Sequence, residues 1–264
     1  DRPIMVTGGT YNEGSPRAVF EVEAHAGQLL TLAVEDVQTS GLSSAPVYYS
    51  IDGGANWVRY NGTPFVAGPV HVLVAVDITG EADAPYEVSE EFRLVVNKNQ
   101  TTQASASAFI VDDGTGNIAP EINEASDNVA NPMADLGGIK DDDRAVTVTS
   151  PTVNEASPFA VFTVKGGANQ RVTLALSDGT AVAADYGLSL QVSADGGQTW
   201  LLYNTGTVAL NGNGELLVRT PVRQDSNYER AETFTLTATN GSGVPAPGTA
   251  TIVDDGTGTI DRKS

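Results

Sequence analysis

The chain of 264 residues has no cysteine, so no disulfide can cross-link it and no thiolate can hold a soft metal. A secreted protein without disulfides can be stabilised by bound metal instead, although a cytosolic protein also fits this absence. Basic residues are scarce: 14 Lys or Arg stand against 33 Asp or Glu, and the net charge is −19. This balance argues against nucleic acid and anionic membrane surfaces as partners and favours cations.

Aromatic residues make up 6% of the chain, and there are two histidines. No run of 18 apolar residues occurs, so the sequence predicts no membrane-spanning helix and no membrane insertion. A glycosidase needs two facing carboxylates, but no aromatic-rich cleft accompanies the many acidic residues. His25 and His71 lie in the first half of the chain without counterparts in the second, and no serine triad is visible. We therefore expect no enzyme.

What the chain does contain is an internal repeat. Ile110–Ile118, with the sequence Ile-Val-Asp-Asp-Gly-Thr-Gly-Asn-Ile, returns 142 positions later at Ile252–Ile260 with one change. The same spacing relates Asn12-Glu13 to Asn154-Glu155. A self-match at a fixed spacing indicates tandem structural units. We expect a first repeat over residues 1–118, a linker over 119–142 and a second repeat over 143–264, and, because Asp1-Arg2 matches Asp143-Arg144, a piece of a longer array.

Within each repeat the apolar residues recur with period two, as in a half-buried strand. Val172, Leu174 and Leu176 alternate with polar residues, and Phe234 and Leu236 alternate with threonines. Helical signal is nearly absent. About seven short strands in roughly 115 residues are typical of a β-sandwich, with a barrel as the alternative. The fold prediction is all-β: two tandem antiparallel β-sandwiches joined by an acidic linker that contains prolines and glycines.

Acidic residues recur at the 142-residue spacing, in loops or at predicted strand ends. Because strand ends gather at the two ends of a sandwich, residues far apart in the sequence can meet there. Calcium takes six to eight oxygen ligands, mostly carboxylates and carbonyls from flexible loops, whereas magnesium demands tighter geometry. The alternative is that acidic loops only keep the protein soluble. Solubility does not require paired carboxylates directly after apolar strands. The recurring pairs are Glu13 with Glu155, Asp83 with Asp225, Glu87 with Glu229, Glu90 with Glu232, Asp112 with Asp254, and Asp113 with Asp255.

Four motifs follow one another in the second repeat: Val153–Ala156, Asp178–Ala181 with Asp185-Tyr186, Tyr228–Phe234 and Ala250–Asp255. With them the second repeat resembles the Calx-β domain, the calcium-binding sandwich of sodium–calcium exchangers and many surface proteins. Three further segments are Asp143-Arg144, Gly196–Trp200 and Asp254–Gly258. They are similar to the Asp-Asp-Arg start, the Gly-Gly-x-Thr-Trp segment and the Asp-Asp-Gly-Thr-Gly end of the Ig-like extender repeats of giant bacterial repeats-in-toxin (RTX) adhesins.

The resemblance implies calcium ligands in both repeats. The first repeat departs from the pattern, because Gly41–Ala45 stands near the place of Asp178–Ala181; one ligand is therefore missing there unless Asp36 substitutes. The implied ligands are Glu155, Asp178, Asp225, Glu229, Glu232, Asp254 and Asp255 in the second repeat, and Glu13, Asp83, Glu87, Glu90, Asp112 and Asp113 in the first.

The linker ends in Asp141, Asp142 and Asp143. We expect some of these, Asp142 and Asp143 among the metal ligands, to join the acidic pole of the first repeat and stiffen the junction when calcium binds. A separate motif, Ser193–Trp200, fits the Asp-box pattern of sialidase propellers, and Ser50–Trp57 nearly does. A hairpin in which Asp caps a Gly-Gly turn explains both, since propeller blades recur at far shorter spacing.

Three classes of function stay open: an extender whose task is reach, a module that binds a carbohydrate or peptide, and an enzyme. A ligand module should show an aromatic platform in one repeat only, but Trp57 and Tyr60 recur as Trp200 and Tyr203, which favours core packing. The resemblance favours the extender, part of a calcium-binding adhesin on the bacterial cell surface that supports cell adhesion and biofilm formation. The expected partners are neighbouring repeats of the same polypeptide, with the chain otherwise monomeric and extracellular.

Overall fold

The computed structural model describes residues 3–83, 85–98, 102–122, 131–138, 140–226 and 228–260. The chain forms two compact units, Asp1–Asp141 and Asp142–Ser264. Both consist of β-strands, and the described residues contain one 3-10 turn, η1 (Leu42–Ser44). None of these residues lies in a helix of the length and apolar character that crossing a membrane requires. The all-β prediction is confirmed. The described residues of each unit form ten strands instead of about seven, because several strands of two or three residues are too short to show a period.

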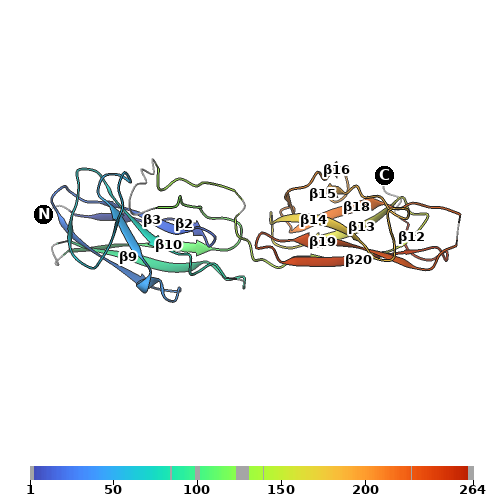
Figure 1. Ribbon diagram of the computed structural model, residues 1–264, viewed down its shortest axis with the longest axis horizontal. Helices are drawn as coiled ribbons and strands as arrows, with labels where there is room; N and C mark the ends of the chain where they lie inside the picture. Colours follow the sequence, from blue (N-terminus) through green and yellow to red (C-terminus); the bar gives the residue numbers. More distant parts are fainter. Residues whose placement is uncertain are drawn as a thin grey trace. The chain divides into compact units, whose positions relative to one another are not determined.

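The first unit holds strands β1 to β10, four of which are labelled in Figure 1. One sheet has the order β1-β3-β8-β5-β6 and the other β2-β10-β9-β4-β7. The strands are β1 (Met5–Thr7), β2 (Thr10–Asn12), β3 (Arg17–Glu23), β4 (Leu29–Asp36), β5 (Val47–Ser50), β6 (Val58–Arg59), β7 (Phe65–Val66), β8 (Val72–Asp77), β9 (Glu90–Lys98) and β10 (Thr102–Val111).

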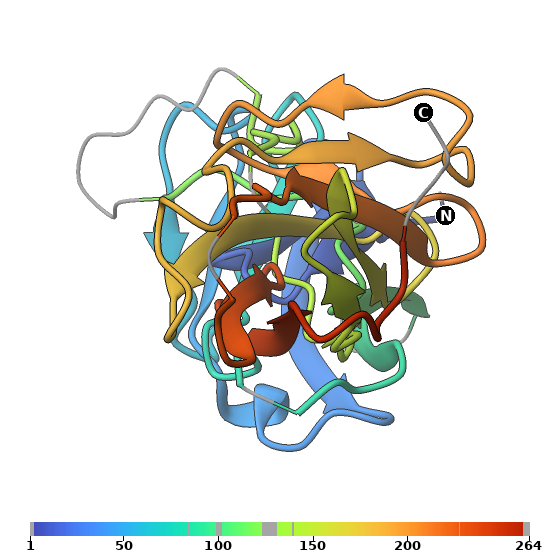
Figure 2. The same cartoon turned by 90° about the vertical axis from the view of Figure 1, so that its right-hand side faces the viewer.

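The second unit repeats this arrangement strand for strand, with sheets β11-β13-β18-β15-β16 and β12-β20-β19-β14-β17. Figure 2 shows this sandwich, coloured yellow to red, close to end-on. The strands are β11 (Thr147–Val148), β12 (Thr152–Asn154), β13 (Phe159–Lys165), β14 (Arg171–Asp178), β15 (Gln191–Ser193), β16 (Leu201–Leu202), β17 (Val208–Ala209), β18 (Glu215–Pro221), β19 (Glu232–Thr239) and β20 (Pro245–Val253).

Among the described strands, each sandwich has one parallel pair, β2 with β10 in the first and β12 with β20 in the second, and the other strand pairs are antiparallel. The parallel pair arises because the first segment of each repeat pairs with one sheet, as β1 or β11, and then crosses to the other. At the first crossing a Cβ on Gly8 would lie 2.1 Å from the carbonyl oxygen of Ser107, so only glycine fits. At the second crossing the glycine lies on the facing strand, where a Cβ on Gly248 would lie 2.4 Å from the oxygen of Thr149.

Each unit has its own apolar core between its two sheets. At the centre an edge-to-face pair of phenylalanines recurs: Phe20 with Phe92, centroids 5.6 Å apart, and Phe162 with Phe234, centroids 5.8 Å apart. These rings come from the alternating positions that the period-two pattern assigns to the inside.

Of the segment predicted as a linker, 119–142, the described residues up to Asp141 belong to the first unit. Ala119 and Ile122 belong to its buried core, and the backbone N–H of Ala119 donates to Ser15 Oγ at 2.9 Å. At the far end, the Asn12 side chain forms hydrogen bonds with both backbone groups of Asp141, at 2.9 and 3.0 Å. Residues 123–130 and Ile139 lie outside the described residues.

Candidate functional site

The topology gathers the recurring acidic residues at one end of each sandwich. Because β2 and β10 run parallel, their last paired residues are Asn12 and Val111, and the acids that follow, Glu13 and Asp112, emerge at the same pole. Strand β9 is antiparallel to β10 and begins at this pole with Glu90, which pairs with Ile110. We call the end formed by these residues and the loop from β8 to β9 the acidic pole of the first repeat.

Backbone hydrogen bonds fix two of the carboxylates of this pole. Glu13 accepts a bond from the backbone N–H of Asp83 at 3.1 Å, and Asp112 accepts one from the N–H of Glu87 at 2.6 Å. Glu13 and Asp112 are both buried, and ligand oxygens of the two lie within 4.8 Å of one another. Two carboxylates are therefore held close together in a setting with little water.

The second repeat forms the same two contacts between the homologous residues. Glu155 accepts a bond from the N–H of Asp225 at 2.7 Å, and Asp254 accepts one from the N–H of Glu229 at 3.4 Å. Glu155 is buried like Glu13. Although the bond from Asp225 by itself lowers the pKa of Glu155, burial and the neighbouring Asp254 carboxylate raise that pKa more. The recurrence in sequence is thus a recurrence of geometry.

A second group of carboxylates lies in the second repeat, formed by Asp185, Glu229 and Glu232, whose ligand oxygens all lie within 4.8 Å of one another. Asp185 sits in the loop after β14, and its carboxylate accepts a bond from the backbone N–H of Val182 at 2.7 Å. Burial, the Asp185 and Glu229 carboxylates, and a side-chain hydrogen bond to Asp185 raise the pKa of Glu232.

The first repeat makes a matching group with a residue from a different loop. Glu90, the counterpart of Glu232, forms a side-chain hydrogen bond with Glu81, and burial together with the Glu87 and Glu81 carboxylates raises its pKa to about 7. The residue 142 positions before Asp185 is Ser43, and the residue 142 positions after Glu81 is Arg223, so neither acid recurs at the spacing of the other pairs. The third carboxylate comes from the loop between β8 and β9 in the first repeat (Glu81) and from the loop between β14 and β15 in the second (Asp185).

Sequence reasoning missed Asp185 and Glu81 as site residues. Asp185 lies within a motif that carried the family resemblance, and this signal could have identified it. Glu81 has no acidic counterpart 142 positions later, so the recurrence that selected the other acids could not find it.

Asp178 and Asp36 are equivalent residues at the ends of β14 and β4, and their carboxylates have different hydrogen-bond partners. Asp178 accepts a hydrogen bond from the Tyr186 hydroxyl at 2.5 Å. Asp36 accepts bonds from the side chains and backbone of the turn at η1, including the Ser43 hydroxyl at 2.6 Å and the Ser43 N–H at 3.1 Å. These bonds, the Ser43 hydroxyl first, lower the pKa of Asp36.

Asp113 and Asp255 shape the turns after β10 and β20. Each accepts a bond from the backbone N–H two residues on, Thr115 at 3.0 Å and Thr257 at 2.9 Å, and from the hydroxyl of the same threonine. Their side chains therefore have a structural partner already, and their role as metal ligands stays a prediction.

Asp142 lies in the second unit, where both of its carboxylate oxygens bind Arg144, at 2.8 Å to Nε and 2.7 Å to Nη2. Gln170 Nε2 donates to the same carboxylate at 3.2 Å. This bidentate pair gives the Asp-Arg motif a structural reason. That Asp142 and Asp143 join the acidic pole of the first repeat stays a prediction.

The Asp-box motifs are turn caps, as the hairpin interpretation predicts. Asp195 accepts bonds from Ser193 Oγ at 2.7 Å and from the N–H groups of Gln198 and Thr199 at 3.0 Å. Asp52 binds Ser50 and Asn56 in the same manner. Both motifs are explained without a ligand.

The donor set of both poles suits a hard divalent cation. All candidate ligands are carboxylate oxygens from strand ends and loops, and the charged neighbours that raise the pKa of Glu90 and Glu232 are themselves carboxylates. A cluster of this kind is strained by mutual repulsion, and a cation with oxygen preference relieves it. The site residues fit calcium in their chemistry.

No family model matches the sequence, and no curated protein matches it. Among solved structures, the chain is similar to the D00-D0 domain of intimin, with 13% identity over 96% of this chain and 100% of that chain and a TM-score of 0.37. It is also similar to CBD12 from CALX1.2, with 11% identity, coverage of 89% and 81% and a TM-score of 0.29.

A third similar structure is the tetra-tandem repeat in the extending region of a large adhesion protein, with 13% identity and a TM-score of 0.28. The match covers 96% of this chain and 49% of that structure, so the chain spans about half its length. At these identities and TM-scores the likenesses carry no argument about function.

Proposed function

We propose that the chain is a pair of calcium-stabilised structural repeats that extend a large adhesin from the bacterial cell surface and so support cell adhesion and biofilm formation. The observation that carries this proposal is the duplicated carboxylate geometry. The Glu13–Asp83 and Glu87–Asp112 contacts of the first repeat recur in the second at homologous positions.

Each repeat then has two neighbouring places for a cation. One lies beside the buried glutamate that follows β2 or β12, which is Glu13 or Glu155. The other lies beside the glutamate that begins β9 or β19, which is Glu90 or Glu232. When bound, calcium would neutralise the repelling charges and tie loops far apart in sequence to one centre. The residues that would hold it are Glu13, Asp83, Glu87, Asp112, Glu81 and Glu90 in the first repeat, and Glu155, Asp225, Glu229, Asp254, Asp185 and Glu232 in the second.

Calcium bound at the acidic poles would make the sandwiches more stable outside a cell than inside it. Extracellular calcium sites can bind with a Kd of about 10⁻⁴ to 10⁻³ M, because extracellular calcium is plentiful. A chain without cysteine has no disulfide to stabilise it, and a few calcium sites fill that need. We therefore assign the repeats to an extracellular, non-catalytic role, with neighbouring repeats of the same RTX-type adhesin polypeptide as their partners and no other subunit.

Isothermal titration of the EGTA-treated and dialysed chain with calcium tests the metal half of this proposal. We expect saturable binding, a weaker response to magnesium, and loss of part of the binding in Glu13→Gln and in Glu155→Gln separately. Glu215→Gln is the matched control, because Glu215 pairs with Lys165 at 3.0 Å at the start of β18, whose far end leads into the acidic pole. If the titration with calcium gave only the heat of dilution, the proposal would be overturned.

The extender half is tested by small-angle scattering. In calcium we expect stiff repeats, with one well-defined maximum dimension. In chelator we expect a broader distribution of interatomic distances, because the repeats are no longer held stiff. An unchanged distribution would mean that calcium does not stiffen the chain and would remove the mechanical role from the proposal.

A further inference from the structure

Both histidines of the chain line one hollow of the first repeat, although they are far apart in the sequence. His25 follows β3, and His71 directly precedes β8. The hollow has a volume of about 330 Å³ and is lined by Glu23 and Met5 as well. Strand β3 begins shortly after Glu13 of the acidic pole and ends at Glu23, so the hollow lies at the opposite end of this strand.

The strand register brings Glu23 and His71 together on one face of the sheet. Val22 pairs with Val72 at the end of the β3–β8 ladder, so the next residues outward, Glu23 and His71, stand opposite each other. On its other side Glu23 pairs with Met5 of β1. Directly opposite residues have Cβ atoms about 5 Å apart, so a carboxylate and an imidazole in these places can reach the same ion.

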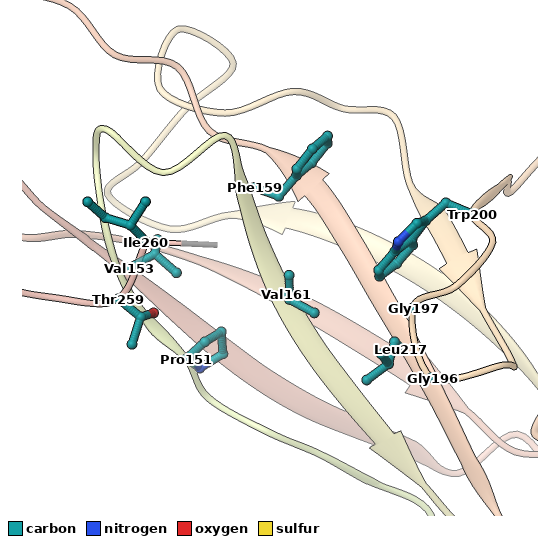
Figure 3. Close-up of a pocket in the computed structure, with 10 residues that line it drawn as sticks. All are labelled: Pro151, Val153, Phe159, Val161, Gly196, Gly197, Trp200, Leu217, Thr259 and Ile260. Carbon is teal, nitrogen blue, oxygen red and sulfur yellow. The ribbon is translucent and has the colours of Figure 1, made fainter. Parts of the chain in front are cut away.

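Figure 3 shows the equivalent face in the second repeat. Val161 of β13 and Leu217 of β18 line a hollow there and lie outside the buried core. Because side chains alternate along a strand, Lys165 and Glu215 lie on the same outer face, further along the two strands. They pair in the register and form a salt bridge, with 3.0 Å between Lys165 Nζ and Glu215 Oε1.

The first repeat replaces this balanced pair by one that lacks a permanent positive charge. Glu23 occupies the place of Lys165, because each pairs with the edge strand of its sheet, β1 or β11. His71 occupies the place of Glu215 in the ladder with β3 or β13. Glu21, two positions before Glu23 on the same face, adds a second carboxylate. Two carboxylates thus accompany one imidazole, and a bound cation would balance their charge.

Glu21 holds the imidazole of His71 in the form that a metal ion needs. The Nδ1–H group of His71 donates to the Glu21 carboxylate. Because an ionised carboxylate only accepts, Nδ1 carries the proton and Nε2 of the neutral ring keeps its lone pair. In metal-binding histidines a carboxylate commonly holds one ring nitrogen in this way while the other binds the metal.

The backbone of His25 is fixed, whereas its side chain is exposed. Its N–H donates to Gln28 Oε1 at 2.9 Å, and its carbonyl accepts the N–H of Gln28 at 3.0 Å. The turn is tied to a neighbouring loop, because Gly27 N–H donates to the Ala67 carbonyl at 2.9 Å. His25 is therefore presented at the hollow by a well-anchored turn.

The ligand atoms of Glu23, His25 and His71 are not all within 4.8 Å of one another; among the described residues, the groups of three that satisfy this distance are carboxylate clusters. All three side chains are exposed, and exposed side chains change rotamer within nanoseconds. We therefore expect the three to converge on an ion by side-chain rotation, with a weaker affinity than a preformed site would have.

We propose that the first repeat binds a divalent transition-metal ion, of which zinc is the test case, through His25, His71 and Glu23. Imidazole nitrogens suit such ions, whereas calcium takes oxygen ligands, so the site differs from the acidic pole in chemistry as well as in place. Three protein ligands and one water are a common set for zinc. Glu21 acts as a positioning residue through His71. This inference does not rest on calcium binding at the poles.

Nuclear magnetic resonance of the untagged chain tests the proposal, because its two histidines give two imidazole Cε1–H signals. In millimolar calcium, which fills the acidic poles if they bind it, we expect zinc chloride to shift both signals together, with one saturable midpoint. A shift of one signal alone, different midpoints for the two, or no shift up to millimolar zinc would overturn the proposal.

Substitutions identify the ligands by isothermal titration with zinc in the same buffer. His25→Asn, His71→Asn and Glu23→Gln should each weaken zinc by at least about tenfold. The three side chains are exposed, so the core is left intact. Glu215→Gln is the matched control, since it changes the equivalent place in the second repeat, and it should leave the affinity unchanged. Wild-type affinity in either histidine variant would overturn the proposal.

The positioning role of Glu21 has its own readout, the nitrogen-15 shifts of the His71 ring, which report the nitrogen that carries the proton. We expect Nδ1 to be protonated in the neutral ring of the wild type. Glu21→Ala should move the proton toward Nε2 and weaken zinc by about tenfold. The same ring form in the wild type and in Glu21→Ala would overturn the role of Glu21.

Discussion

Replacing Glu232 by glutamine should change the stability of the second repeat in opposite directions with and without calcium. Glu232 lies within 4.8 Å of Asp185 and Glu229, measured between ligand oxygens. Glutamine keeps the size of the side chain and removes its charge. In chelator the change relieves repulsion, whereas in calcium it removes a ligand.

The magnitude follows from Coulomb's law. Two unit charges 4.8 Å apart repel by about 3 kcal/mol at an effective dielectric near 20, and partial exposure reduces a pair of this kind to about 1 kcal/mol. For a repeat of this size about 1 kcal/mol corresponds to about 4 °C in Tm. We therefore expect Glu232→Gln to raise the Tm of the second repeat by about 4 °C in EGTA at pH 8. In calcium at ten times Kd it should forfeit about 1.4 kcal/mol per lost site and melt below the wild type.

Differential scanning calorimetry of the two proteins in EGTA and in calcium measures both shifts, with Glu215→Gln as the control for loss of one negative charge at an exposed ion pair. The control should shift equally in both buffers. If Glu232→Gln moved the Tm in the same direction with and without calcium, the idea that these carboxylates repel one another until a cation binds would be wrong.

Three further predictions concern the framework around the sites. The N–H groups of Ile118 and Gly137, with Lys140, hold the pKa of Asp135 at about 2; this stabilisation is present above the ordinary value of 3.8 and is lost as pH falls toward 2. Carbon-13 titration of the Asp135 carboxyl should give a midpoint near 2, and one at 3.8 would contradict these bonds. Ile122→Asp in a Trp200→Phe protein should shift Trp57 emission to the red, because Ile122 and Trp57 belong to the same buried cluster; unchanged emission would mean that the packing of Ile122 does not keep water from Trp57. Asp142→Asn breaks a mostly buried pair with Arg144 and should lower the stability of the second repeat by about 3 kcal/mol in urea unfolding, with or without calcium; a loss seen only in calcium would assign Asp142 to the metal.

Much of the fold was predictable because the repeat and the period-two pattern are properties of the sequence. The spacing of 142 residues makes Phe162 the equivalent of Phe20 and Asp254 the equivalent of Asp112, and the alternating pattern assigns the phenylalanines to the core, where the structure places them. The parallel pairing of β2 with β10 was not predictable, because three-residue strands carry no period and the crossing depends on a close approach at Gly8.

The acidic poles were predictable only as far as recurrence reached. Glu13, Glu87 and Asp112 were selected because they recur, and the structure brings them together through backbone hydrogen bonds. Glu81 and Asp185 were missed because each repeat fills the third position from a different loop. The packing of residues 119–122 onto the first unit was missed because these residues are polar enough on average to suggest a linker, although Ala119 and Ile122 are buried.

The most direct measurement of the central claim is the melting temperature of the intact chain as calcium is titrated into the EGTA-treated protein. The duplicated poles predict that both sandwiches melt at higher temperature with each rise in calcium above Kd, and that magnesium at the same concentration has a smaller effect. Melting curves that coincide in EGTA and in millimolar calcium would show that the carboxylate poles do not hold the metal.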